Sequence, residues 1–147
     1  MRFDIVTRAS PAQVRRALTD FTDTRLQTWH RTVDAKTYEL RDQGEHWAVV
    51  RESTPGSPFW VVARYEWPDA HEVRWTVTES SYGGGGDGFV RVAPREGGGS
   101  RVHAEWRNAD ARRQKVLLWL IQHGPVHLLV SRLWTEALDR YASEDGG

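Results

Sequence analysis

The stretch VLLWLIQHGPVHLLVSRLWTEALDRY, residues 116–141, has the pattern of one long helix that starts near residue 110. From Val130 to Tyr141 the apolar residues recur every three or four positions, which is typical of a helix with one apolar face. The half before it is apolar on every side and must be covered from more than one direction. Gly124 and Pro125 separate the halves, and the proline, which lacks a backbone donor, predicts a kink there. We expect the rest of the chain to wrap around this helix.

The composition indicates one domain with a sizeable core. A chain of 147 residues buries about 68–70% of the surface that its unfolded form exposes. Its 20 basic and 20 acidic residues give a formal net charge of zero and form no blocks, which argues against binding to nucleic acid. There is no cysteine, so disulfides and thiolate metal sites are excluded.

Neither a signal peptide nor a membrane span is expected. The N-terminal residues contain no apolar run of signal-peptide length. The most apolar window, 116–130, contains polar residues and is shorter than the ~20 residues that cross a bilayer. We therefore expect a cytoplasmic protein without stable membrane insertion. Monomer and homodimer both remain open, because the apolar surface around Trp119 could also be a dimer interface.

The N-terminal part predicts one strand followed by two short helices. Residues 2–9 alternate in polarity like a half-buried strand. Ser10 is a suitable cap, the proline after it suits a first helical position, and Gln13 completes a capping box. A helix is therefore expected over Pro11–Thr19, and a second short one over about Thr24–His30.

From Val33 onward the polarity repeats at every second residue, which is typical of strands. Turn residues separate the runs, and the short connections predict an antiparallel meander. The expected strands cover residues 33–41, 46–53, 59–67, 71–80, 87–94 and 100–107. This is an α+β order, in which a curved sheet can close around the last helix.

Three local patterns, together with the order of the elements, carry a resemblance to a known superfamily. They are SPAQVRRALTDF at 10–21, WPDAHEVRW at 67–75 and GGGSRV at 97–102. Over Arg2–Ala142 the chain resembles the helix-grip START-like superfamily, which includes polyketide cyclases, dehydratases and proteins related to lipid transport. The resemblance implies a curved seven-stranded antiparallel sheet wrapped around a long C-terminal helix, with two short helices after the first strand. We expect a single domain over 1–147, with 143–147 as a disordered tail.

The resemblance also implies a cavity between sheet and helix for an apolar or aromatic molecule. Aromatic residues on the expected inward faces support this, because rigid rings with a few polar groups suit a small-molecule pocket. They are Trp29, Trp47, Tyr65, Trp75, Trp106 and Trp119. The alternative is that these rings simply fill the core.

Charged residues on the expected inner face are informative, because a buried charge without a partner is costly. Arg51, on the strand face of Trp47, and Glu79, at the end of a row with Trp75, are candidates for ligand contact. The alternative is a charge at a strand end in water, or an internal ion pair. Three nearby charged residues are expected on the outer face: Glu52, Arg64 and Glu66.

Two further features suggest sites but lack the residues that those sites need. His123 and His127 are four residues apart, yet no glutamate and no third ligand accompany them, so no metal and no cofactor is expected. Plain structural histidines are the simplest interpretation, with His123 as the candidate for pocket lining. The glycine run 83–88 is followed by neither Gly-Lys-Ser/Thr nor a helix, so we expect a hairpin tip at the cavity entrance that could act as a gate.

Three functions remain open. The first is a binding protein for a hydrophobic or aromatic small molecule, lipid- or polyketide-like, which the absence of a recognisable nucleophile–base pair favours. The second is an enzyme similar to polyketide cyclases and dehydratases, in which Arg51, Glu79, His123 or Tyr65 positions and polarises a ketone or enol. The third is a partner-binding domain similar to the activators of a chaperone ATPase, which no sequence feature favours. The predicted ligand-binding residues are Trp47, Arg51, Tyr65, Trp75, Glu79, Trp106, Trp119 and His123.

Overall fold

The computed structural model describes residues 1–145, which form seven strands and four helices. In chain order these are β1 (Arg2–Thr7), α1 (Pro11–Thr19), α2 (Thr24–Thr28), β2 (Glu39–Gln43), β3 (Trp47–Ser53), β4 (Trp60–Glu66), β5 (Glu72–Ser80), β6 (Gly85–Pro94), β7 (Ser100–Ala109), α3 (Lys115–His123) and α4 (Val126–Asp145). The order of elements agrees with the prediction, although α2 ends before the expected His30.

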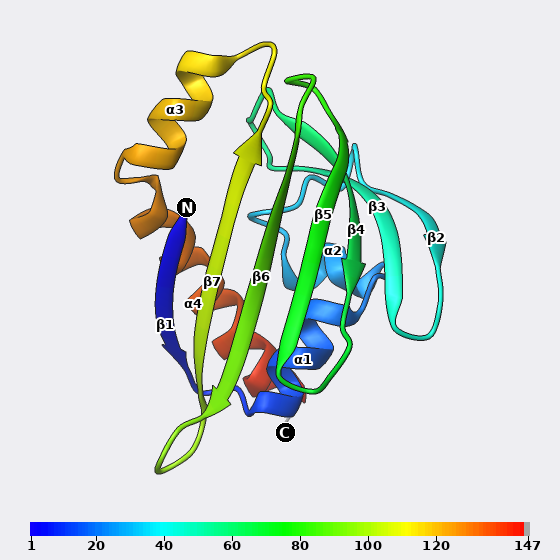
Figure 1. Ribbon diagram of the computed structural model, residues 1–147. Helices are drawn as coiled ribbons and strands as arrows, with labels where there is room; N and C mark the ends of the chain where they lie inside the picture. Colours follow the sequence, from blue (N-terminus) through cyan, green and yellow to red (C-terminus); the bar gives the residue numbers. More distant parts are fainter. Residues whose placement is uncertain (146–147) are drawn as a thin grey trace.

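All seven strands form one antiparallel sheet. The order across it is β1-β7-β6-β5-β4-β3-β2, so six strands form the predicted meander and β1 pairs with the last of them. The sheet curves, and α1, α2 and α4 lie on its concave side (Figure 1), which we call the inner face. The predicted helix-grip fold is thereby confirmed.

The first helix begins where its capping pattern predicts. The backbone N–H of Gln13 donates to Ser10 Oγ at 3.2 Å, and the N–H of Ser10 donates to Gln13 Oε1 at 2.9 Å. Both halves of the capping box are therefore formed. Val14, Ala17 and Leu18 then face the interior and are buried.

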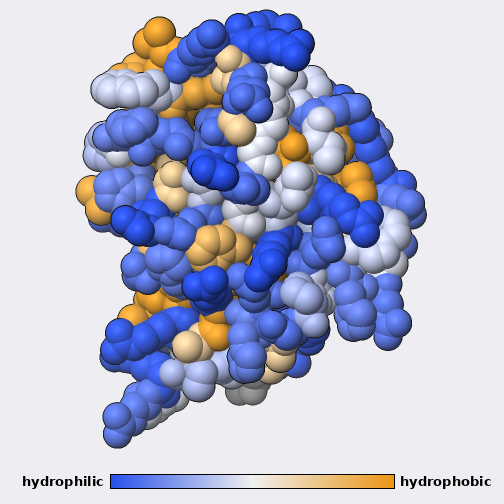
Figure 2. Space-filling model, viewed as in Figure 1, coloured by the Kyte–Doolittle hydropathy of each residue, from blue (hydrophilic) through white to orange (hydrophobic). Residues whose placement is uncertain are grey.

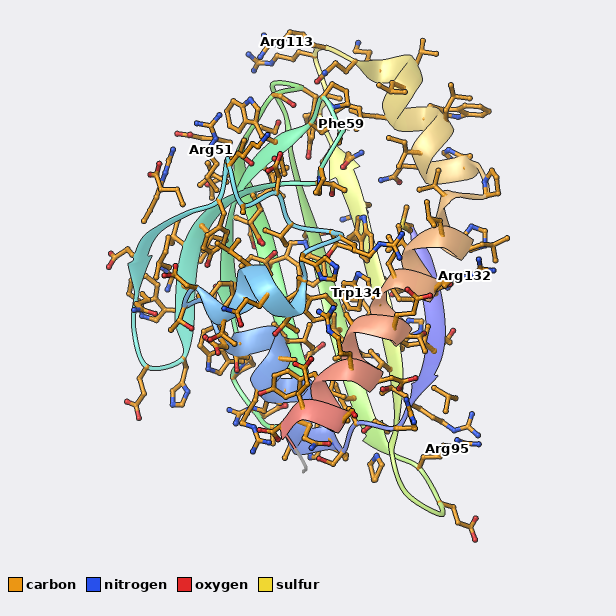
Figure 3. All side chains as sticks on the ribbon, turned by 180° about the vertical axis from the view of Figure 1, so that it is seen from behind. Arg51, Phe59, Arg95, Arg113, Arg132 and Trp134 are labelled. Atoms are coloured by element: carbon orange, nitrogen blue, oxygen red, sulfur yellow. The ribbon has the colours of Figure 1, made fainter. Side chains whose placement is uncertain are left out.

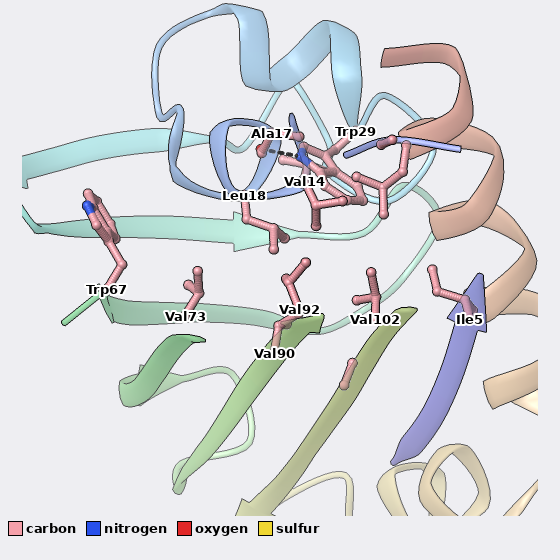
Figure 4. Close-up of a cluster of buried hydrophobic side chains, with 14 of the residues drawn as sticks. Ile5, Val14, Ala17, Leu18, Trp29, Trp67, Val73, Val90, Val92 and Val102 are labelled. Carbon is pink, nitrogen blue, oxygen red and sulfur yellow. Dashed lines mark hydrogen bonds between the residues drawn. The ribbon is translucent and has the colours of Figure 1, made fainter. Parts of the chain in front are cut away.

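The packed core lies where α1 covers the inner face. Figure 4 shows valines of β5, β6 and β7 facing α1, with Trp29 beside Val14 and Ala17 on the helix side. Trp29 is buried, and its indole N–H donates to the carbonyl oxygen of Ala17 at 2.9 Å, so its one polar group is satisfied. Leu138 places α4 in the same cluster, where it is fully buried.

Two predictions about the segments before β2 and β6 are wrong. The strand expected over 33–41 starts only at Glu39, because the residues before it form turns. In one of these, the carbonyl oxygen of Asp34 accepts from the backbone N–H of Tyr38 at 3.1 Å. The glycine run expected as a hairpin tip is partly strand, since β6 starts at Gly85.

The C-terminal helix is broken at Gly124 and Pro125. α3 and α4 are bent by 67° relative to each other, so the interruption at the proline is confirmed and the single long helix is wrong. No single helix within residues 1–145 is long and apolar enough to cross a membrane, and α3 with α4 passes that test only as a bent pair.

α4 extends beyond the predicted end of the last helix. It continues to Asp145 rather than ending at about Tyr141. Asp145 Oδ2 accepts hydrogen bonds from the side chains of Gln13 and Arg16 on α1, which fixes the last turn against that helix. Residues 146–147 of the predicted tail lie outside the described residues.

Candidate functional site

Four aromatic side chains form a continuous row across the inner face. They are Tyr65 of β4, Trp75 of β5, Trp106 of β7 and Trp134 of α4. Successive ring centroids are 5.6, 6.0 and 6.0 Å apart along the row. Figure 3 shows Trp134 on α4 in front of the sheet, where it links helix and sheet. We call these four side chains the aromatic row.

Gly88 of β6 provides the space for two of these rings. It pairs with Trp75 on one side and with Trp106 on the other. A Cβ at position 88 would lie 2.4 Å from the ring of Trp75 and 2.7 Å from the Cβ of Trp106. Both indoles can therefore occupy the inner face only because the strand between them carries no side chain there.

Burial of the inner face changes at the aromatic row. On the central strands, the inward side chains toward α1 are buried: Val73, Val90, Val92, Val102 and Ala104. Toward α3, five inward positions from the row onward are only partly buried: Trp75, Val77, Gly88, Trp106 and Asn108. Ala63 of β4 and Ser80 at the end of β5 are buried on the same side of the row, so the partly buried positions are concentrated on the central strands β5, β6 and β7. The inner face therefore has a packed half under α1 and an open half toward α3, and the aromatic row lies on their border.

One end of the row is bonded to a buried ion pair. The Tyr65 hydroxyl donates to Glu52 Oε1 at 2.5 Å, and Arg25 Nε of α2 donates to Glu52 Oε2 at 3.1 Å. The side chains of Arg25 and Glu52 are 7% and 9% exposed. The guanidinium carbon also lies 4.3 Å from the ring centroid of Phe21, a cation–π contact. We call Arg25, Glu52 and Tyr65 the polar cluster.

The surroundings fix the protonation of this cluster at neutral pH. Burial raises the pKa of Tyr65 well above its ordinary value of 10.0, and the charge of Glu52 raises it further. Burial alone would lower the pKa of Arg25, but the neighbouring Glu52, followed by the phenol groups of Tyr65 and Tyr38, together raise it more. Burial also raises the pKa of Tyr38 to about 12, and its hydroxyl donates to the carbonyl oxygen of Phe21. Tyr65 is therefore a neutral phenol next to a charged pair.

Three of the predicted ligand-binding residues, Tyr65, Trp75 and Trp106, belong to the aromatic row. Their predicted position on the inner face is confirmed, and their contact with a ligand stays a prediction. Trp29, which was expected among the pocket aromatics, is instead buried in the packed core.

Trp47 and Arg51 lie on the outer face of β3, so their predicted inward position is wrong. In the register of β3 with β4, Ala48 pairs with the inward Tyr65, and the residues on either side of Ala48 point outward. The guanidinium of Arg64 lies 4.4 Å from the ring centroid of Trp47, which it covers on that face.

The sequence of β3 explains why its inward and outward faces were predicted the wrong way round. Trp47 and Val49 occupy one face and Ala48 and Val50 the other, so both faces are apolar and alternation does not distinguish them. The structure places the smaller pair inside, where both are 0% exposed. Glu52 shares their face and is buried with them, although it was expected outside.

The predicted inward position of Glu79 is also wrong, because β5 contains a bulge. The register with β4 shifts between Val77 and Glu79, and Thr78 is the extra residue. Beyond a bulge the alternation of faces is reversed. The side chain of Glu79 is accordingly 61% exposed and forms an ion pair with Arg41 at 3.6 Å.

Trp119 and His123 do not line the inner face, because α3 is turned away from the sheet. Trp119 is 59% exposed, and the imidazole of His123 stacks on its indole with centroids 4.9 Å apart. His127 Nδ1 lies 3.3 Å from the carbonyl oxygen of Gly124, a local contact within the bend. Within residues 1–145 there is no group of three His, Cys, Asp or Glu side chains that could hold a metal ion.

Three residues of the site were not predicted from the sequence. Trp134 was visible in the apolar stripe of the last helix but was not connected with the strand aromatics. The inward position of Glu52 would have been predicted if Ala48 and Val50, which share its strand face, had been placed inside. Arg25 gave no signal, because it lies in a helix of five residues and only the fold brings it to Glu52.

Two surface concavities lie elsewhere. One, of about 550 Å³, is on the outer face of the sheet and is lined by charged side chains such as Asp4, Glu72 and Arg91. The other, of about 230 Å³, lies between α2 and α4, beside Trp29 and Arg140. Neither is lined by the aromatic row, so the open half of the inner face is a separate candidate surface.

Comparisons with known proteins agree with this architecture. No curated protein sequence matches the chain. A solved structure from Thermus thermophilus is 19% identical, covers 100% of this chain and 99% of its own, and has a TM-score of 0.73. The Zhui aromatase/cyclase of a Streptomyces species is 14% identical over 95% of this chain and 93% of its own, with a TM-score of 0.67. A START superfamily protein of Mycobacterium smegmatis is 8% identical over 98% and 97%, with a TM-score of 0.67.

At these identities the solved structures show the fold alone. The family model described as "Polyketide cyclase / dehydrase and lipid transport" matches residues 2–141 of the sequence. This match covers nearly the whole chain, including every strand, both short helices and most of α4. The protein therefore belongs to the polyketide cyclase/dehydrase and lipid transport family.

Proposed function

We propose that the protein binds a flat hydrophobic or aromatic small molecule on the open half of the inner face, between the sheet and α4. The observation that carries this proposal is the position of the aromatic row. Its four rings are adjacent and keep contact with solvent, although they lie on the concave side of the sheet. Such rings offer a large apolar area and stacking geometry to a planar ligand.

The polar cluster suggests the chemistry of one end of that ligand. The Tyr65 hydroxyl donates its hydrogen bond to Glu52, so its oxygen can still accept a hydrogen bond from a ligand. Arg25 is enclosed by Phe21 and Glu52 and is therefore a support for Glu52 rather than a ligand contact. A fused-ring molecule with a hydroxyl group at one end satisfies both the row and the cluster, and such molecules occur among polyketides.

The test is calorimetric titration of the protein with 1,8-dihydroxyanthraquinone, a flat hydroxylated probe. Trp75→Leu and Trp106→Leu should each weaken binding by about tenfold or more, since an aromatic stack contributes roughly 1–3 kcal/mol. Trp47→Leu is the matched control, because it removes the same side chain from the other face of the same sheet. It should leave the Kd within about twofold.

Equal losses in all three variants, or no loss in any, would contradict the proposed site. Native mass spectrometry of the protein as purified from its host is an independent check. A bound aromatic or lipid-like compound that is absent from the Trp106→Leu variant would support the same surface, and retention of that compound by the variant would count against it.

A second candidate, a cyclase- or dehydrase-like enzyme, is favoured by the carboxylate of Glu52. A carboxylate hydrogen-bonded to a phenol can receive a proton that the phenol takes from a substrate enol, which is general base catalysis. Tyr65→Phe separates the candidates, since it keeps the pair of Arg25 and Glu52. In the enzyme, conversion of a poly-β-keto thioester should fall by about 100-fold or more while the Kd of the anthraquinone changes by less than about fivefold. If the wild type shows no conversion, binding without catalysis remains.

A further inference from the structure

α3 and the first turn of α4 expose a concentration of large apolar side chains. Within residues 1–145, seven such side chains are exposed, and six of them lie between residues 116 and 129. They are Val116 (76% exposed), Leu117 (40%), Trp119 (59%), Leu120 (51%), Leu128 (62%) and Leu129 (55%). Figure 2 shows hydrophobic surface, in orange, at the upper left over α3. We call these six side chains the apolar patch.

The outward side of α3 is apolar along the length of the helix. Leu118 is the buried residue of α3 and marks the side that faces the protein. With 3.6 residues per turn, Val116, Trp119 and Leu120 lie on the opposite side, together with His123. A surface helix normally presents polar residues there, so this orientation calls for a partner that covers it.

Basic residues flank the apolar patch along the chain. Residues 111–135 contain no aspartate or glutamate, and they carry four cations, Arg112, Arg113, Lys115 and Arg132. All four are exposed, and none takes part in an ion pair of the described chain. The chain as a whole has a formal net charge of zero, so this excess is local to the segment that bears the patch.

We propose that the apolar patch and its four cations dock the protein onto the surface of an anionic phospholipid bilayer. Tryptophan and leucine on one side of a helix, flanked by lysine and arginine, have the chemistry of a helix that lies in the membrane interface. Each cation near such a surface adds to the attraction. α3 has nine residues and the bent pair is not a straight span, so the contact is peripheral. This inference goes beyond the proposed ligand and does not depend on it.

Two other ways to cover the apolar patch explain fewer of its features. If α3 closed over the open half of the inner face, the apolar residues would be covered, but the four unpaired cations would have no role. If a second copy of the chain bound through the same surface, the apolar patch of one copy would contact the apolar patch of the other, as in a twofold-symmetric dimer. The four cations of each copy would then be brought together, and residues 111–135 contain no acidic residue to balance them. An anionic lipid surface satisfies both the apolar residues and the charge.

The chain has no cysteine, so a single one can report on its surroundings. Leu120→Cys and Val6→Cys place an environment-sensitive fluorophore in the apolar patch and on the outer face of the sheet, where Val6 is 41% exposed. On addition of phosphatidylcholine vesicles with about 30% phosphatidylglycerol, the label at 120 should shift to the blue and the label at 6 should not. Equal responses at both positions, or none at either, would overturn the proposal.

Co-sedimentation with the same vesicles measures how much the cations and the apolar side chains each contribute to vesicle binding. Arg112→Gln and Lys115→Gln should each reduce partitioning by about fivefold, and the effect should shrink as salt is raised. Arg95→Gln is the control for charge, because Arg95 and Arg113 lie at opposite ends of the molecule (Figure 3). Trp119→Glu should reduce binding to the level seen with pure phosphatidylcholine, and Val6→Glu should leave it unchanged.

Two further results would overturn the proposal. One is wild-type binding that is no stronger to anionic than to neutral vesicles. The other is a concentration-dependent dimer that Trp119→Glu dissociates and that binds no vesicles, which would make the apolar patch an interface between copies. Circular dichroism of each variant checks that it is folded, which the exposure of all the substituted residues leads us to expect.

Discussion

The packed half and the open half of the inner face belong to the same strands, yet their surroundings differ. In the packed half, α1 and Leu138 of α4 cover valines that are almost completely buried. In the open half, α3 is bent by 67° from α4, and the inward residues Val77 and Asn108 beyond the aromatic row keep contact with solvent, while Ala63 and Ser80 at its edge are buried. The comparison teaches that the helices, rather than the strands, decide which part of this sheet is core and which part is available for binding.

The largest loss of stability is expected from a substitution in the polar cluster, which connects α2 to the border between the two halves. Glu52→Gln leaves the charge of Arg25 buried without a partner, which should lower the free energy of unfolding by about 3–5 kcal/mol. The control is Glu136→Gln, which removes an exposed ion pair between Arg31 and α4. It should cost less than about 1 kcal/mol in the same urea titration.

The double variant Arg25→Met with Glu52→Leu sharpens this test. Replacing both charges by apolar groups should recover much of the loss, since no unpaired charge remains. If Glu52→Gln costs no more than Glu136→Gln, the buried pair is not what fixes α2 against the sheet.

A second prediction compares two leucines of the C-terminal helices. Leu138→Ala empties a fully buried position of the packed half and should lower the free energy of unfolding by about 2–5 kcal/mol. Leu120→Ala removes the same atoms from the apolar patch and should change it by less than about 0.5 kcal/mol. Similar losses in urea unfolding would mean that α3 is packed against the protein in solution, and the distinction between the halves would fail.

The smallest effect concerns alkaline pH. The folded state raises the pKa of Tyr65 well above 10.0 and that of Tyr38 to about 12, in both cases chiefly by burial. A raised folded pKa contributes stability that is fully present below the unfolded value and is lost as pH rises through the folded value. The free energy of unfolding should therefore fall from about pH 10 upward, by at most about 1.4 kcal/mol per pH unit for each tyrosine. Tyr65→Phe and Tyr38→Phe should each reduce this slope, and an unchanged slope in the double variant would refute the assignment.

The sequence predicted those elements whose signals are local. The capping box at Ser10 needs only the residues beside it, and α1 was placed without error. Pro125 interrupts a helix whatever surrounds it, so the break between α3 and α4 was expected. The alternation along β7 separates its faces clearly, which placed Trp106 inside.

The remaining parts of the site depend on contacts between distant residues. The faces of β3 are equally apolar, so Trp47 and Glu52 were exchanged between inside and outside. Arg25 meets Glu52 only in the folded chain. Trp119 is apolar enough for a core, but hydrophobicity states a preference for burial and does not say whether the fold supplies a cover.

The bulge at Thr78 reverses the alternation of inward and outward side chains along β5. Before it, Val73, Trp75 and Val77 point inward, and after it Ser80 does, while Glu79 stays outside. Losing Thr78 itself would turn the bulged strand into a regular one and keep every other side chain on its present face. Losing a residue between Val73 and Val77 would exchange the faces on one side of the gap. For this strand, the position of a deletion therefore matters more to the binding surface than the identity of the residue deleted.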